Sequence, residues 1–266
     1  MTPRTAPSVE SNAYALRVRY GVSLGIHDIF GFIERLGYRS IRYPFGEDRI
    51  CGMAIVHAGA RYIVTNSSLV LGREIFTAAH EIGHHQLHMK GSQSSSVLDL
   101  SVGISQDIVE RQADSFAAAL LLPQHDLEAF VLNHLKKSKN SEFNGFDIAR
   151  TQTEFATSYD AVVLRLQKLG FLREPQSAIL RQEKAETGAN ALLKAIGGNT
   201  ELSRASSTIR IPQEFVDWTL ENYRNRMIRF EKFSSLLSLI GIDAEPFKVT
   251  ETDDDESQDE VFEVRP

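Results

Sequence analysis

The sequence lacks several features that would direct a chain to the cell exterior or into a membrane. It has one cysteine, Cys51, in 266 residues, so an internal disulfide is excluded. No run of eighteen apolar residues occurs, so a membrane span is not expected. Residues 1–13 have no apolar core of the kind that a secretory signal needs. These absences together predict a soluble cytoplasmic protein, in which Cys51 is a small buried apolar residue.

The sequence also lacks a strong excess of either charge outside its last residues. The net charge is −6, but residues 249–266 hold eight acids against Arg265, a net of −7, and the rest of the chain is about +1. Such a like-charged block is usually solvated and disordered, although it can also imitate nucleic acid or act as a docking arm. The remainder has no basic stripe, which disfavours direct reading of DNA.

One segment, FTAAHEIGHHQLH at 76–88, carries the clearest chemical signal. His80 and His84 are four residues apart, so on a helix they share one face and can hold a single metal ion. Glu81 is placed to act as a base on a metal-bound water. Gly83 costs about 1 kcal/mol against Ala in a helix, which predicts close approach of another backbone or of substrate there. The alternative is a solvated helix that happens to carry two histidines.

A second amphipathic helix is predicted over 107–122, ended by Pro123. Glu110 and Asp114 are four residues apart on one face. Glu110 is the expected third ligand, which leaves one position open for water. Asp114 is expected to accept the free N–H of a ligating His. The nitrogen and oxygen ligand set favours Zn²⁺, with Mn²⁺ or another divalent ion possible in the cell. Without the upstream motif, a solvated helix face would be the better reading.

The pattern H-E-x-x-H followed by E-x-x-A-D resembles the gluzincin pattern of zinc metallopeptidases. Together with the lead-in at Phe76 and the close at Pro123, it is similar to the ImmA/IrrE family of metallo-endopeptidases. This resemblance implies cleavage of a helix-turn-helix transcriptional repressor, in a DNA-damage response or a mobile genetic element. Gln112 stands where an acid is frequent in the family, and Asp114 where Asn is frequent. Neither departure removes a ligand.

Peptide hydrolysis also needs a group that stabilises the developing oxyanion. His88, one turn beyond His84, and Tyr159 are candidates, although His88 can equally be a polar residue at a helix end.

Two other function classes stay open. One is a non-proteolytic, metal-containing regulator that binds the repressor, and the other is a DNA-binding protein.

The expected fold class is α+β. Strands at 38–45, 50–57 and 61–66 predict a small antiparallel three-stranded sheet, packed on the two motif helices and preceded by a helix capped by Asp28. The strand at 61–66 is the expected edge, or the neighbour of the edge, at which an extended peptide could add as a further strand. The Ser-rich stretch 91–105 is expected to be a loop.

Composition suggests four parts along the chain. They are a metallopeptidase domain at 1–138, a helix-turn-helix-like segment at 139–175, a helical C-terminal region at 176–248 and the acidic tail at 249–266. Within the second part, residues 146–170 read as two short helices with Ser158 near the cap of the second. This segment offers only two basic residues on its second helix, Arg165 and Lys168, which is few for a segment that contacts DNA bases. A structural or repressor-contacting role is therefore favoured. Helices are expected near 178–196 and over 212–240.

Overall fold

The computed structural model describes residues 8–46, 50–92, 95–100, 108–139 and 141–248, with residues 95–100 as backbone only. The acidic tail predicted at 249–266 lies outside these residues. The chain divides into two compact units, one up to Arg210 and one from Ile211 onward. No helix among the described residues has the length and apolar character needed to cross a bilayer.

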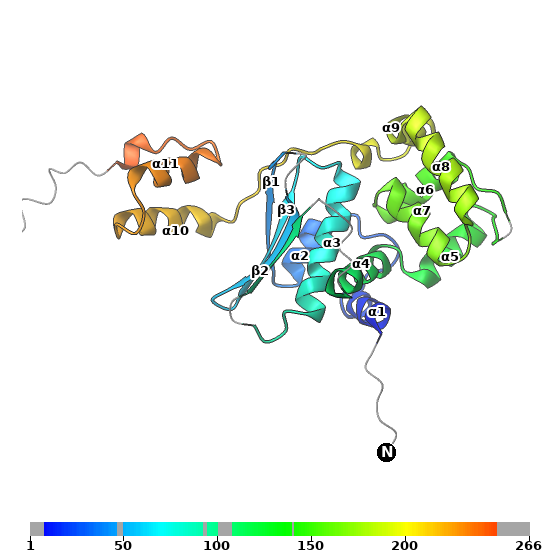
Figure 1. Cartoon of the computed structure of the whole chain (residues 1–266), viewed down its shortest axis with the longest axis horizontal. Helices are drawn as coiled ribbons and strands as arrows, with labels where there is room; N and C mark the ends of the chain where they lie inside the picture. Colours follow the sequence, from blue (N-terminus) through cyan, green and yellow to red (C-terminus); the bar gives the residue numbers. More distant parts are fainter. Residues whose placement is uncertain (1–7, 47–49, 93–94, 101–107, 140, 249–266) are drawn as a thin grey trace, which may run out of the picture. The chain divides into compact units, whose positions relative to one another are not determined.

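The first unit contains both helices and a sheet, which confirms the α+β class (Figure 1). Its helices are α1 (Val9–Arg19), α2 (Ile29–Arg35), α3 (Leu71–Leu87), α4 (Ile108–Leu121), α5 (Gln124–Asn133), α6 (Gly145–Phe155), α7 (Tyr159–Lys168), α8 (Glu174–Thr187), α9 (Ala189–Ala195) and the 3-10 turn η1 (Thr200–Ser203). Its strands are β1 (Arg39–Tyr43), β2 (Ile50–His57), β3 (Ala60–Asn66) and β4 (Ser95–Leu100).

The second unit is a small helical module. It contains α10 (Gln213–Arg224), α11 (Phe230–Ser238) and the 3-10 turn η2 (Glu245–Phe247), and buries a cluster of Phe233, Leu237 and Ala244. The expected helical region over 212–240 is therefore two helices.

The sheet is mixed, so the prediction of a purely antiparallel sheet is wrong. The order is β1-β3-β2-β4, with β2 antiparallel to both of its neighbours and β1 parallel to β3. The tight turn at Ala58-Gly59, both with positive φ, makes β2 and β3 a hairpin. Because β1 lies on the far side of β3 rather than beside β2, the first and third strands run in the same direction.

The fourth strand, β4, forms in the stretch that was expected to be a loop, of which residues 93–94 and 101–105 lie outside the described chain. Its pairing with β2 makes it an edge of the sheet, and β3 lies inside. β3 is therefore the neighbour of an edge strand, the second of the two positions expected for it.

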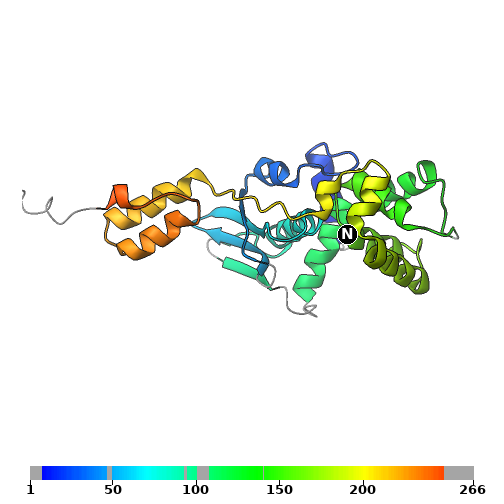
Figure 2. The same cartoon turned by 90° about the horizontal axis from the view of Figure 1, so that it is seen from above.

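Helix α3 lies at the centre of the first unit, against β2 and β3 on one side and α4 on another (Figures 1 and 2). Twelve of its 17 residues are buried, including Ile75, Ala79 and Ile82. A Cβ added at Gly83 would lie 3.2 Å from the Cα of Ala113 in α4. This contact confirms that Gly83 allows a close approach, and the partner is the backbone of α4.

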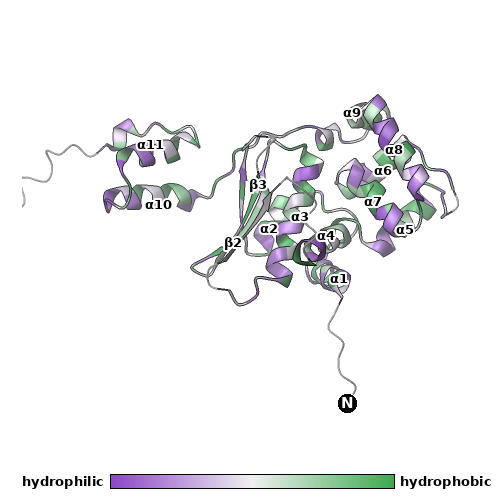
Figure 3. Ribbon diagram, viewed as in Figure 1, coloured by the Kyte–Doolittle hydropathy of each residue, from purple (hydrophilic) through white to green (hydrophobic). Residues whose placement is uncertain are grey.

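Helices α5 to α9 lie at the end of this unit away from the sheet (Figures 1 and 2), and hydrophobic and hydrophilic residues alternate along them (Figure 3). The two short helices predicted over 146–170 are confirmed as α6 and α7, joined through Ala156 in the left-handed conformation. The Ser158 side chain accepts the backbone N–H of Ala161, as expected of a cap. The single helix expected near 178–196 is broken at Gly188, where φ is +84°.

The expected boundaries near residues 138 and 175 do not coincide with a division of the core. Ile82 of α3 shares one hydrophobic core with Phe155 and Val162 of the helix-turn-helix-like segment and with Leu180 and Leu202 beyond it. The described chain up to Arg210 therefore packs as one unit.

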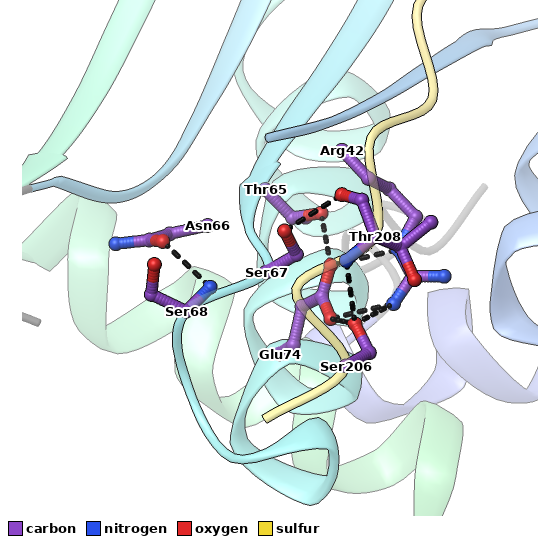
Figure 4. A network of polar contacts seen from close by, with 8 residues as sticks. All are labelled: Arg42, Thr65, Asn66, Ser67, Ser68, Glu74, Ser206 and Thr208. Carbon is purple, nitrogen blue, oxygen red and sulfur yellow. Dashed lines mark hydrogen bonds and ion pairs between the residues drawn. The ribbon is translucent and has the colours of Figure 1, made fainter. Parts of the chain in front are cut away.

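Residues 204–210, the strap, fasten the end of this unit to the sheet. The strap exchanges backbone hydrogen bonds with β1 between Arg42 and Arg210, at 2.8 and 2.9 Å. Figure 4 shows the side chains beneath it: Arg42 donates from Nε and Nη2 to the two oxygens of Glu74, at 2.8 and 2.7 Å. Thr65 donates to the same carboxylate at 2.8 Å, and Ser206 of the strap accepts from Arg42 at 2.8 Å. The start of α3, the sheet and the strap therefore share one buried ion pair.

Replacing Arg42 with Met should destabilise the protein by about 3 kcal/mol or more, because it leaves the fully buried carboxylate of Glu74 without its cation. Urea unfolding followed by circular dichroism measures this change. The matched control is Arg204→Met, which removes an exposed strap arginine 3.6 Å from Glu201 and should cost about 1 kcal/mol or less. Equal losses for the two variants would contradict the importance of the buried pair.

Candidate metal centre

Helices α3 and α4 bring three ligand atoms to one point. His80 Nε2 lies 2.9 Å from His84 Nε2 and 3.0 Å from Glu110 Oε2, and His84 Nε2 lies 3.4 Å from the same oxygen. The two imidazoles lie edge to face one helical turn apart on α3, and the carboxylate comes from the first turn of α4. In the part of the chain that the structure describes, these three residues are the group of side chains that could hold a metal ion.

The distances fit a tetrahedral metal site. Ligands about 2.0–2.1 Å from a zinc ion at tetrahedral angles lie about 3.3 Å from one another. The three observed separations are close to this value, and two imidazole nitrogens with one carboxylate oxygen form a familiar zinc set. The residues present therefore fit a divalent ion with one coordination position left for water or substrate.

Asp114 lies behind His80, the first candidate ligand. Its Oδ1 is 2.9 Å from Nδ1 of His80. When His80 Nδ1–H donates to this carboxylate, the lone pair of Nε2 is left to face the metal position. The Asp114 side chain is about half exposed, so this contact works at the edge of the site rather than in its interior.

The second ligand is oriented by a chain of two residues. His84 Nδ1 lies 3.2 Å from His88 Nδ1, and His88 Nε2 lies 3.0 Å from the Oε1 of Gln112. If Gln112 accepts the Nε2–H of His88, then His88 Nδ1 accepts from His84, and His84 Nε2 is free to bind metal. His88 thus contacts the back of a ligand. Sequence reasoning missed any role for Gln112, because nothing in the helical pattern distinguishes it.

Tyr159, the other candidate for stabilising an oxyanion, has a different environment. Its side chain is buried, and its hydroxyl donates to the backbone carbonyl of Leu180 in α8 at 3.1 Å. Burial raises the pKa of Tyr159 far above its usual value, and the nearby Glu183 and Asp160 add to this shift. The geometry therefore gives Tyr159 a structural contact and offers no support for contact with the reacting atoms.

Burial also sets the protonation of the second ligand. It lowers the pKa of His84 from its ordinary 6.5 to about 3, and the neighbouring His80, His88 and His85 add to this effect. The imidazole is consequently neutral near pH 7, which is the form that binds a metal ion.

Two imidazoles from H-E-x-x-H, a carboxylate from a second helix and an acid directly after the first imidazole define the site of a metal-dependent hydrolase. The family model described as the IrrE N-terminal-like domain, a metallopeptidase model, matches residues 33–167. This match covers half of the chain and includes all three candidate ligands. The protein belongs to the ImmA/IrrE metallopeptidase family.

One curated protein resembles part of this chain. The chain is similar to "Uncharacterized immunity region protein 2" of Bacillus phage phi105, with 35% identity over 89 residues. The aligned part is 34% of this chain and 50% of that protein. The chain thus spans about half the length of the curated relative it matches.

The metal-free protein should lose stability as the pH falls from about 6.5 towards 3. In this range the unfolded chain protonates His84 and the folded chain does not, because the folded pKa is depressed. The expected slope from this residue approaches about 1.4 kcal/mol per pH unit. Urea unfolding with chelator at several pH values measures it.

His84→Gln is the matched variant for this measurement, since it removes the titration from a buried position. Carboxylates and other histidines, including His85, whose pKa burial also lowers, contribute to both proteins. The stability of the variant should therefore depend less steeply on pH. Identical slopes for the two proteins would contradict the assigned pKa of His84.

Proposed function

We propose that this protein is a zinc-dependent endopeptidase that cleaves a helix-turn-helix transcriptional repressor. The observation that carries the proposal is the convergence of His80, His84 and Glu110 beside Glu81. A divalent ion held by these three residues would supply a Lewis acid and would lower the pKa of a coordinated water towards about 7. Glu81 then acts as general base towards the attacking water and as general acid towards the leaving amine.

Glu81 is held in a narrow space between α3 and the sheet. Its side chain is fully buried. The neighbouring strand residue is Gly52, where an added Cβ would lie 2.8 Å from Glu81 Oε1 and 2.5 Å from Cγ2 of Thr77. The absence of a side chain at Gly52 therefore makes room for the carboxylate, and Gly52 acts as a positioning residue.

The proposed position of the peptide substrate is an edge of the sheet. The edge strand β4 pairs with β2, the strand that carries Gly52. An extended peptide could add to the outer edge of β4 through backbone hydrogen bonds and so lie along the side of the sheet nearest Glu81. At the opposite edge, β1 already pairs with the strap at Arg210. This arrangement moves the expected peptide edge from β3 to β4.

The repressor as substrate rests on the family resemblance of the two motifs. Similarity to a protein of a phage immunity region agrees with a regulatory role in a mobile element. A stress response to DNA damage is the other setting that the family suggests. In either setting, cleavage would relieve repression.

The alternative is a non-proteolytic regulator that binds the repressor or DNA. Direct DNA reading through α7 is disfavoured by the positions of its basic residues. Arg165 is buried, and its guanidinium donates to Leu122 O at 3.0 Å and to Glu10 at 2.9 Å. Lys168 pairs with the same Glu10 at 3.3 Å. These side chains join α7 to α1 and to the end of α4.

Glu81→Gln should reduce cleavage about 10²–10⁴-fold while leaving the metal bound, because it removes the proton carrier and keeps all three ligands. The test incubates the zinc-loaded protein with a repressor encoded beside it and follows the products by mass spectrometry. Chelator should also abolish cleavage, and added zinc should restore it.

The control variant is Glu142→Gln, which neutralises an exposed carboxylate whose side chain forms no described contact with the site. It should cleave at the original rate. If Glu81→Gln still relieves repression in cells while cleavage is absent, binding alone is sufficient and the non-proteolytic alternative holds.

Gly52→Ala should lower cleavage about 100-fold without loss of zinc, since the new methyl group would displace the Glu81 carboxylate by a few tenths of an ångström or more. Zinc content and cleavage rate are measured on the same sample. Ala54→Gly is the matched control, because it lies on the same buried face of β2 but adds no volume near Glu81. Full activity of Gly52→Ala would contradict the positioning role.

A further inference from the structure

A cavity lies in the first unit, apart from the candidate metal centre. Its volume is about 670 Å³, within the usual range for small-molecule sites. Its walls come from the start of α3, from α6 and α7, from the junction of α8 and α9, and from η1. Apolar side chains form much of the lining, among them Val70, Phe76, Leu164 and Leu202. The candidate ligands His80, His84 and Glu110 are not among the residues that line it.

A buried amide in the wall of this cavity has no partner for its oxygen. The Gln152 side chain is 1% exposed, and its Oε1 accepts no hydrogen bond from any described residue. A buried polar atom of this kind is usually satisfied. An amide oxygen accepts hydrogen bonds, so a donor group on a bound molecule would satisfy Gln152. A hydroxyl or amide group on a ligand fits this position.

The charges around the cavity favour an anion. Lys184 is already neutralised by Asp160, with Nζ 2.5 Å from Oδ2. Arg73 also lines the cavity, and its Nη2 donates to Sγ of Cys51 at 3.4 Å, which is a weak acceptor. Arg73 forms no ion pair with an acid in the described chain. A guanidinium that forms no ion pair with an acid is suited to bind the carboxylate of a ligand.

We propose that this cavity binds a small apolar carboxylate that also carries an amide or hydroxyl group. The apolar body lies against Phe76 and Leu164, the polar group meets Gln152, and the carboxylate meets Arg73. Phe76 precedes His80 by one helical turn on α3, so the ligand contacts the helix that carries two of the candidate metal ligands. The binding site itself does not depend on the proposed peptidase activity.

The first test uses two probes on the unaltered full chain. N-acetyl-L-tryptophan has the aromatic body, the amide and the carboxylate, and N-acetyl-L-tryptophanamide differs only in lacking the negative charge. Isothermal titration calorimetry should show saturable 1:1 binding of the acid, with the neutral probe about tenfold weaker. The absence of saturable binding of the acid at millimolar concentration would overturn the proposal.

Variants then locate the site. Arg73→Met should weaken the acid about tenfold and leave the neutral probe unchanged, whereas Gln152→Leu should weaken both. Ala189→Trp, at a position that lines the cavity, should block both probes. Lys194→Met is the matched control, an exposed lysine of α9 outside the lining, and should bind as the original chain does.

A carboxylate probe can also bind a metal ion directly, so the titration is repeated with chelator. Binding in the cavity should persist without zinc. Binding that disappears with chelator and ignores Arg73→Met would place the probe at the metal centre and reject the cavity. The comparison of the two probes on the unaltered chain decides the charge preference even if a variant fails to fold.

Discussion

The candidate metal centre depends on the close approach of α3 and α4 at Gly83. Two ligands come from one helix and the third from another, so their convergence requires that the two backbones lie closer than most side chains permit. A Cβ added at Gly83 would lie 3.2 Å from the Cα of Ala113, a contact tighter than most Cβ atoms make. Glycine inside a helix costs about 1 kcal/mol. In return, the close packing of the two helices fixes Glu110 relative to His80 and His84. The distances between their ligand atoms suit a tetrahedral metal ion.

The same helix is held at its other end by a buried charge. Glu74 in the first turn of α3 is satisfied by Arg42, Thr65 and the strap residue Ser206. The strap lies beyond residues 33–167, the part that matches the family. Later residues therefore complete the packing of the family domain and also form part of the cavity through η1. Helix α3 thus contacts two separate sites, with the metal ligands in its second half and the cavity at its start.

Several residues around these sites make room for other side chains or orient them. Gly52 leaves space for Glu81, and Gln112 orients His84 through His88. In the helix-turn-helix-like segment, Arg165 joins α7 to its neighbours instead of facing solvent. That segment packs into the core of the first unit through Phe155 and Val162.

The spacing of residues along the sequence was enough to predict the features that lie within a single helix. The four-residue spacings in 80–84 and 110–114 place side chains on shared helix faces, and Asp28 and Ser158 mark helix starts through their own hydrogen bonds. The parallel pairing of β1 with β3, the fourth strand at 95–100, and the roles of Gln112 and Gly52 could not be predicted in this way. Each depends on contacts between residues far apart in the chain. Periodicity reports which face of an element is buried, whereas the neighbour that covers this face is decided only when the whole chain packs.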